Sequence, residues 1–77
     1  LTVSPNPANN FINLTFYNSL SKICKIQIFS AVGKNFICDY KNDDNTIKVD
    51  VSELNSGTYF IKVITNNNVY NCKFMKQ

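Results

Sequence analysis

The chain has no histidine, no arginine and no tryptophan, and these absences remove whole classes of function. Without histidine, the three cysteines lack the partner that completes many zinc sites and the base that would activate a nucleophilic thiol. Without arginine, the eight lysines cannot bind phosphate through a planar fork, and they are scattered along the chain rather than clustered. We therefore expect no enzyme, no metal or other cofactor and no nucleic-acid partner, and interpret the net charge of +3 as a solvated surface.

Long hydrophobic runs are also missing. The longest contain only a few residues, far fewer than the ~20 that cross a membrane as a helix. We expect no direct membrane insertion. With 77 residues the chain has room for one domain, and because it begins at Leu1 rather than Met we interpret it as a piece of a longer protein.

The cysteines Cys24, Cys38 and Cys72 are odd in number, which excludes complete internal pairing. No two of them are spaced as C-x-x-C. The alternation described below places all three on apolar faces of strands, and we interpret them as buried free thiols that act as small hydrophobic side chains. One disulfide with one free thiol is the alternative.

What the chain does have is period-2 alternation of apolar and polar residues, the pattern of half-buried strands. About seven short strands separated by turn signals are typical of a sandwich or barrel, and two packed sheets bury the apolar faces best. The fold predicted is all-β: a small immunoglobulin-like β-sandwich of antiparallel strands. The expected strands cover 1–3, 11–17 (Ile12, Leu14 and Phe16 inward), 22–30 (Cys24, Ile26 and Ile28 inward), 35–40 (Phe36, Cys38 and Tyr40 on one face), 46–51 (Ile47, Val49 and Val51 inward), 58–65 (Tyr59, Ile61 and Val63 inward) and 69–76 (Tyr70, Cys72 and Phe74 inward).

Turn signals lie between these segments. Gly33 in "AVGK" supplies a positive φ, and "NNN" (66–68) predicts a hairpin because Asn tolerates the left-handed region. The stretch "KNDDN" (41–45) is expected to be a polar loop. The strand at 58–65 is apolar on its second face as well, through Phe60 and Ile64, so we expect it either to be central or to be partly covered on that face.

Candidate sites outside this pattern are weak. Calcium needs six to eight oxygen ligands, and Asp43, Asp44 and Asn45 supply too few, so we interpret them as a solvated loop. Glu53 is interpreted as a surface charge and the sequon at Asn13 is discounted, because it lies inside a strand. The outward aromatics Tyr17, Phe29 and Phe60 are either ordinary exposed side chains or a stacking platform for a sugar or peptide.

Four stretches in a fixed order carry a resemblance: "SPNPANN", "IFSAVGK", "VDVSELNSGTYFIKV" and "NVYNCKFMKQ". Together they resemble the C-terminal sorting domain of the type IX secretion system of Bacteroidota, in its type A class, from Val3 to Gln77. Ser4, where the family commonly has an aromatic residue, and the three cysteines depart from its pattern. The residues that match its motifs, and that the resemblance implies for recognition, are Pro5, Asn6, Pro7, Gly33, Lys34, Gly57, Tyr59, Lys62, Lys73, Phe74 and Lys76.

The resemblance implies that residues 1–77 are one C-terminal sorting domain, a fragment of a larger secreted protein. Outer-membrane components of the type IX machinery would recognise it in the periplasm and direct its parent to the cell surface or the medium. A sortase-like peptidase would remove it from the mature protein. The alternative is an immunoglobulin-like or fibronectin-like accessory module for adhesion or carbohydrate contact.

We hypothesise that the last strand and the turn at Gly57 carry recognition. An exposed final strand offers backbone groups to which a partner strand can add, and Lys73 and Lys76 add electrostatic steering. The alternative role of these residues is to close the sandwich. Exposed edge strands also favour pairing with a second copy of the chain, as a dimer.

Overall fold

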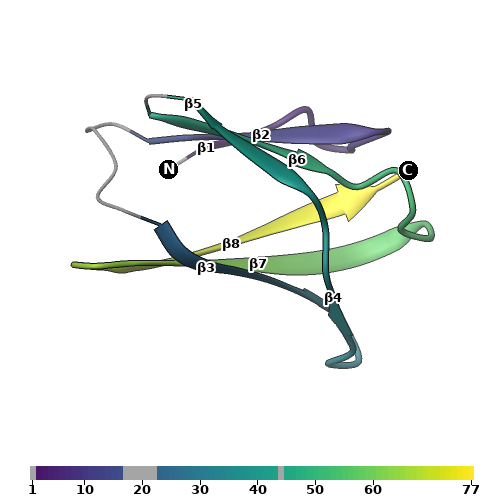
Figure 1. Ribbon diagram of the computed structural model, residues 1–77. Coiled ribbons are helices and arrows are strands. Elements are labelled where there is room, and N and C mark those ends of the chain that lie inside the picture. The colour runs from purple at the N-terminus through teal and green to yellow at the C-terminus, as the bar shows by residue number, and fades with distance from the viewer. Residues whose placement is uncertain (1, 17–22, 44) are drawn as a thin grey trace.

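The computed structural model describes residues 2–16, 23–43 and 45–77, and within these ranges every regular element is a β-strand. The strands form two four-stranded antiparallel sheets stacked face to face (Figure 1). The strands are β1 (Thr2–Ser4), β2 (Phe11–Thr15), β3 (Ile23–Ser30), β4 (Asn35–Phe36), β5 (Tyr40–Asp43), β6 (Thr46–Asp50), β7 (Gly57–Thr65) and β8 (Val69–Lys76).

The strand order confirms the predicted all-β sandwich. The first sheet runs β1-β2-β6-β5 and the second runs β4-β3-β7-β8. This arrangement corresponds to the ABED and CFG sheets of the immunoglobulin fold, with β4 as an additional edge strand. The described residues therefore contain eight strands rather than about seven.

Alternation builds the buried face of the first sheet. Ile12 and Leu14 of β2 lie opposite Val49 and Ile47 of β6, and all four side chains are fully buried. Their chain neighbours point to solvent, as a pleated strand requires. This inward set was predicted from the sequence, together with Phe16 and Val51, which are also buried.

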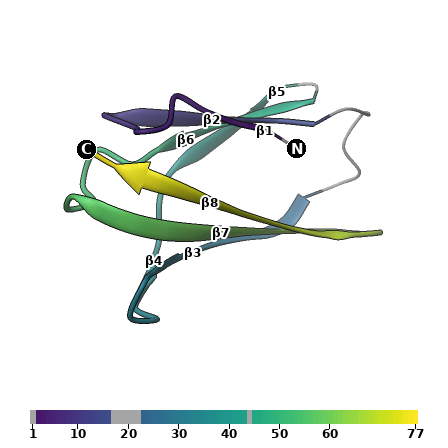
Figure 2. The ribbon, with the colours of Figure 1, turned by 180° about the vertical axis from the view of Figure 1, so that it is seen from behind.

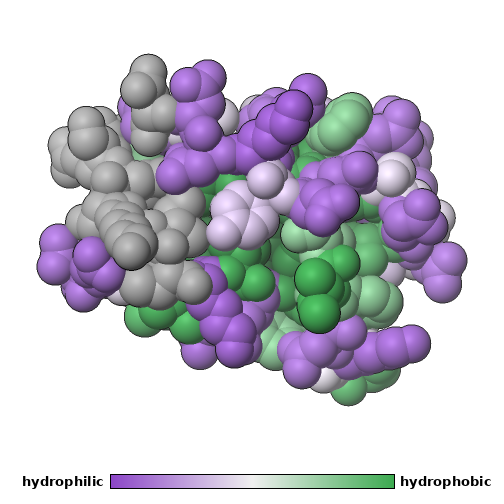
Figure 3. Space-filling view, viewed as in Figure 1, coloured by the Kyte–Doolittle hydropathy of each residue, from purple (hydrophilic) through white to green (hydrophobic). Residues whose placement is uncertain are grey.

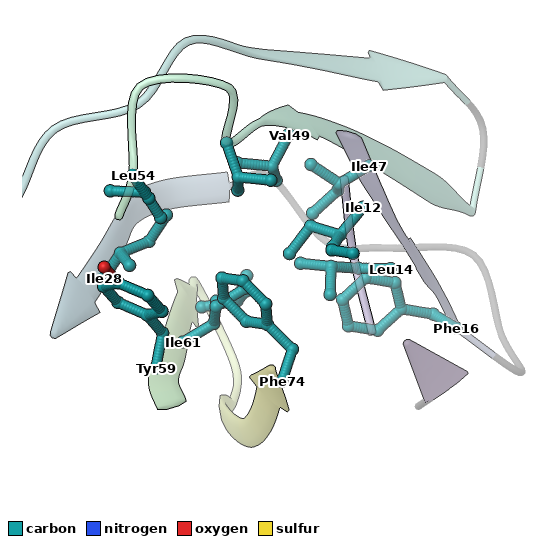
Figure 4. Close-up of a cluster of buried hydrophobic side chains, with 13 residues drawn as sticks. Ile12, Leu14, Phe16, Ile28, Ile47, Val49, Leu54, Tyr59, Ile61 and Phe74 are labelled. Carbon is teal, nitrogen blue, oxygen red and sulfur yellow. The ribbon is translucent and has the colours of Figure 1, made fainter. Parts of the chain in front are cut away.

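The second sheet is built around β7, which lies between β3 and β8. Its inward residues Tyr59, Ile61 and Val63 are buried, and Ile61 pairs with Ile28 on one side and Cys72 on the other. Of the two alternatives expected for this strand, the central position is the one that the sheet order shows. Figure 4 shows side chains from both sheets meeting in one cluster, in which Phe74 is fully buried.

The segment 35–45 is where the sequence prediction was wrong. A single strand over 35–40 does not form: β4 ends at Phe36, residues 37–39 cross to the other sheet, and β5 begins at Tyr40. Phe36 and Cys38 still pack against the core, whereas Tyr40 is exposed. The polar residues that follow Tyr40 pair with β6 as an edge strand instead of forming the predicted loop.

The crossing segment joins an edge strand of one sheet to an edge strand of the other. Ile37 within it is completely exposed between the half-buried Phe36 and Cys38, so burial still alternates there and stops alternating at the exposed Tyr40. Figure 3 shows hydrophobic residues gathered where this segment crosses between the sheets. Backbone pairing to β6, rather than burial of side chains, holds β5 in place, since all four of its residues are exposed.

Two predicted turns are confirmed. Gly33 has φ of 86°, in the left-handed region, between β3 and β4. Residues 66–68 connect β7 and β8 as a hairpin, in which the Thr65 N–H donates to the Asn68 carbonyl (2.9 Å) and the Asn68 N–H donates to Oγ1 of Thr65 (3.0 Å). The predictions that concern Leu1, Tyr17, the turn at 18–21, Lys22, Asp44 and the side chains of Ile23 and Cys24 lie outside the described residues.

Candidate recognition surface

Most of the residues implicated by the resemblance gather at one end of the sandwich. The turn at 31–34 follows Ser30, which pairs with Tyr59 near the start of β7, and Gly57 pairs with Lys76 near the end of β8. The loop after β1 reaches the same end (Figures 1 and 2). Three sequence motifs and the C-terminal end of the chain are thus neighbours in space.

The loop after β1 is bonded to the last strand. We call residues 5–8, which contain Pro5, Asn6 and Pro7, the strap. Oδ1 of Asn6 accepts a hydrogen bond from the Met75 N–H (3.0 Å), and the Ala8 N–H donates to the Met75 carbonyl (2.7 Å). The Gln77 N–H donates to the Ala8 carbonyl (2.8 Å), which extends β8 by a short parallel bridge.

The fully buried Ala8 was not expected from the sequence. A single small apolar residue within a run of Pro and Asn has no periodicity that would mark it as part of the core. Its burial and its two backbone bonds show that the strap is an integral part of the fold.

Tyr59 organises the turn before β7. Its hydroxyl donates to the Asn55 carbonyl (2.7 Å), and its ring stacks on Phe74 with centroids 5.5 Å apart. A tyrosine at the start of this strand that bonds back to the preceding corner is a hallmark of immunoglobulin-like sandwiches. Both aromatic residues are buried, so a partner that docks on the native surface cannot touch them directly.

Gly57 and Lys76 complete this corner. Gly57 has φ of 150°, a conformation open to glycine, and a Cβ added there would meet no atom within 4 Å, so the requirement is one of backbone conformation alone. Nζ of Lys76 donates to the Leu54 carbonyl (3.0 Å). This lysine is therefore held against the fold rather than extended into solvent.

Gly33 and Lys34 form a tight turn at the same end. The Gly33 N–H donates to the Ser30 carbonyl (2.9 Å), and the Ser30 N–H donates to the Lys34 carbonyl (2.8 Å). Nζ of Lys34 lies 5.5 Å from the centre of the Phe36 ring, within range of a cation–π contact. Both turn residues are exposed.

Lys62 and Lys73 lie apart from this end, on the outward face of the second sheet. Lys73 is exposed and pairs with Phe60, whereas Lys62 is half-buried and pairs with Asn71. Of the two lysines that were expected to steer a partner to the last strand, Lys73 is free to do so. Lys76 is engaged by the Leu54 carbonyl.

The outer edge of β8 is covered only in part by the described residues. In an antiparallel strand the backbone groups of alternate residues point to the same side. Met75 directs its N–H and carbonyl to the strap, so those of Asn71 and Lys73 also point away from β7. Within the described ranges, the hydrogen bonds to this edge are at Met75 and Gln77, which leaves the edge open at residues 69–73.

The thiols of Cys38 and Cys72 are free and half-buried, and both pack against the core. Burial raises the pKa of the Cys72 thiol. Burial also raises the pKa of Cys38, and the negative charges of Asp50 and Asp39 add to the effect. A raised thiol pKa lowers the thiolate fraction, so these two residues have the character of structural rather than nucleophilic cysteines.

The remaining candidates have ordinary structural roles. Nδ2 of Asn45 donates to the Phe16 carbonyl (3.0 Å), and Asp43 and Glu53 are exposed. Across residues 2–16, 23–43 and 45–77, no group of three or more His, Cys, Asp or Glu side chains is placed to hold a metal ion. The described part of the chain also contains no helix long and apolar enough to span a membrane.

These features define a small immunoglobulin-like sandwich. The motifs quoted from the sequence form one end of this sandwich and the start of an open sheet edge. The family model described as the secretion system C-terminal sorting domain matches residues 2–77 of this sequence. The chain therefore belongs to this family, the sorting domains of the type IX secretion system. Comparisons with curated proteins and with solved structures gave no match. The chain is thus a sorting signal, and the alternative of an accessory binding module gains no support.

Proposed function

We propose that this domain directs its parent protein across the outer membrane through the type IX machinery, and that a sortase-like peptidase then removes it. The observation that carries the proposal is the family match over residues 2–77. The parent would pass through the periplasm and reach the cell surface or the medium. The partners would be outer-membrane components of the machinery and the peptidase.

We further propose that recognition uses the open edge of β8. A strand of the partner would add beside Asn71 and Lys73, whose backbone groups face outward, and Lys73 would steer an acidic partner. Pro5, Asn6, Pro7, Gly33, Lys34, Gly57, Tyr59, Phe74 and Lys76 would act by shaping this end of the fold and by holding β8 in position. Lys62 would belong to the docking surface itself.

An export test addresses the function. Residues 1–77 are fused to the C-terminus of a fluorescent protein that carries a signal peptide, in hosts with and without a functional type IX translocon. Surface or medium fluorescence that requires the translocon is the expected result. Periplasmic retention in both hosts, with the fusion intact, contradicts the proposal. The mass of the exported fluorescent protein tests the peptidase step, because removal leaves it without the 77-residue domain.

The edge is tested by Asn71→Pro. Proline removes one outward N–H but leaves the bonds between β8 and β7, and it is tolerated at sheet edges. We expect export of the fusion to fall for Asn71→Pro and to be kept for Asn71→Ala, which retains the N–H. Equal export of both variants would show that strand addition at this position is not used.

A further inference from the structure

The outward face of the second sheet carries positive charge alone. Strands β3, β4, β7 and β8 contain no acidic residue, whereas β5 and β6 of the first sheet contain Asp43 and Asp50. The cross-strand register sets outward residues side by side in three rows on this surface, which we call the basic face. The rows are Phe29–Phe60–Lys73, Gln27–Lys62–Asn71 and Lys25–Ile64–Val69.

Apolar groups lie among these lysines. Phe60 and Val69 are 42% and 52% exposed. A shallow hollow of about 300 Å³ lies on this surface and is lined by residues of all three strands: Phe29, Phe60, Ile61, Lys62, Asn71, Cys72 and Lys73. A hollow of this size accepts a protruding side chain.

A second hollow, of about 370 Å³, lies on the first sheet but has a different character. Its lining includes Phe11 and Tyr40 with two lysines and two aspartates, so opposite charges largely cancel there. Nζ of Lys48 lies 4.2 Å from the centre of the Phe11 ring, within range of a cation–π contact. Of these two hollows, the one on the basic face combines an exposed aromatic ring with lining charges of a single sign.

The basic face also adjoins the open edge of β8. Asn71 and Lys73 line the hollow and direct their backbone N–H and carbonyl groups away from β7. A polypeptide strand is the kind of partner that satisfies such groups in register, and its alternate side chains would then lie over the sheet. A second copy that presents the same face would bring like charges together, which is unfavourable.

We propose that the basic face docks an extended acidic segment of an export-machinery protein, which adds to β8 beside Asn71 and Lys73 and places an apolar side chain in the hollow. This proposal rests on the proposed sorting function and names the chemistry of the partner. Acidic side chains of the segment pair with Lys62 and Lys73, and the aromatic surface of Phe60 receives the apolar side chain.

Matched variants of the fluorescent fusion test the proposal. Lys62→Glu with Lys73→Glu reverses two charges on the basic face, and Lys41→Glu with Lys48→Glu reverses two on the first sheet, where these lysines are cross-strand partners. Phe60→Thr and Phe11→Thr each remove an aromatic ring of nearly equal exposure, 42% and 43%, and keep a strand-forming residue. We expect the basic-face variants to lose export about tenfold and the first-sheet variants to stay within about twofold of wild type.

Two outcomes distinguish a failure of the sorting function from a failure of the docking surface alone. Wild-type export that does not require the translocon overturns the sorting function and this proposal with it. Translocon-dependent export of wild type that both basic-face variants retain overturns the docking surface alone. Thermal unfolding of the purified 77-residue chains shows whether each variant keeps the native fold, and a variant that unfolds is replaced by Lys73→Glu alone, at an exposed position.

The chemistry of the partner is tested directly with peptides. Amide resonances of the wild-type chain are followed as the capped peptide Glu-Leu-Glu-Leu-Glu or its lysine counterpart is added. Shifts at residues 71 and 73 that need the acidic peptide and weaken with salt support the proposal, and absence of these shifts contradicts it. Binding of the chain to vesicles that contain phosphatidylglycerol, lost in the Lys62→Glu, Lys73→Glu variant, would assign the face to a lipid surface instead. A dimer that this variant abolishes would assign it to a second copy.

Discussion

The amide of Met75 donates a 3.0 Å hydrogen bond to Oδ1 of Asn6, a residue 69 positions earlier in the chain. This bond joins the first motif, "SPNPANN", to the last, "NVYNCKFMKQ". It lies next to the parallel pairing of Ala8 with Lys76. It gives the asparagine between the two prolines a definite physical role. That role is to hold the end of β8, so the strap limits how far a partner can extend along this edge.

Removal of the Asn6 side chain should loosen the end of β8. For Asn6→Ala we expect faster hydrogen exchange at the Met75 amide, because its acceptor is lost, and a loss of about 0.5–1.5 kcal/mol in the free energy of unfolding. The Phe74 amide should stay protected, since it faces β7. Asn6→Asp keeps an acceptor oxygen and serves as the control. Unchanged exchange at Met75 in Asn6→Ala would contradict this role.

The Tyr59 hydroxyl should contribute measurably to stability. Tyr59→Phe removes its part-buried hydrogen bond to the Asn55 carbonyl, at a cost of about 1 kcal/mol. For a domain of this size the melting temperature should fall by about 4–8 °C. Tyr40→Phe alters an exposed tyrosine and should leave the melting temperature unchanged. Equal effects of the two substitutions in thermal unfolding would rule out the corner bond as the cause.

Lys73 and Lys76 should separate into different roles. Lys76→Met removes the charged donor to the Leu54 carbonyl and should cost about 1–2 kcal/mol in urea unfolding. Lys73→Met should leave stability within experimental error, because Lys73 is exposed. A double charge reversal at these positions therefore mixes a fold defect with a recognition defect. A large loss of stability for Lys73→Met would contradict the assignment.

Acid should weaken the turn after β6. Oδ1 of Asp50 accepts from the hydroxyl and the backbone N–H of Ser52, and these bonds hold the pKa of the carboxyl below its ordinary value. A carboxyl with a lowered folded-state pKa stabilises the fold at higher pH, and this stabilisation is lost as pH falls through that pKa. Melting temperatures measured from neutral to acidic pH should fall less steeply for Asp50→Asn than for wild type. Parallel curves would show that Asp50 contributes nothing to the acid response.

Cys38 and Cys72 should react slowly with iodoacetamide in the native chain. Burial raises the pKa of each thiol, so little thiolate is present at neutral pH. Modification measured by mass spectrometry of the separate peptides should accelerate as pH rises and become fast in urea. Equal rates in native and unfolded chains would contradict the half-buried placement.

The sequence predicted those parts of the fold in which alternation coincides with burial. The inward residues of β2, β6 and β7 follow directly from their spacing. The strand β5 could not be found this way, because all of its residues are exposed and only backbone pairing with β6 defines it. The break after Phe36 was missed for a related reason: Cys38 keeps the apolar spacing while the backbone already crosses to the other sheet.

The residues of the candidate surface could be predicted from the motifs, but the contacts between them could not. Spacing gives no sign that Lys76 reaches the Leu54 carbonyl 22 residues away, or that Asn6 reaches Met75. Such bonds depend on which strands become neighbours. The basic face was equally hidden, because its lysines are scattered along the sequence and are brought together only by the register of β3, β7 and β8.

The bridge between the strap and β8 also bears on biosynthesis. A ribosome makes residues 5–8 long before residues 75–77, and the buried Phe74 is supplied by the same final segment. Within the described residues the hydrogen bonds shown for the strap are to that segment, and contacts so distant in sequence slow folding. A parent chain truncated before Phe74 would therefore lack a completed domain. A correctly folded sorting domain therefore indicates that translation has passed the last strand of the domain.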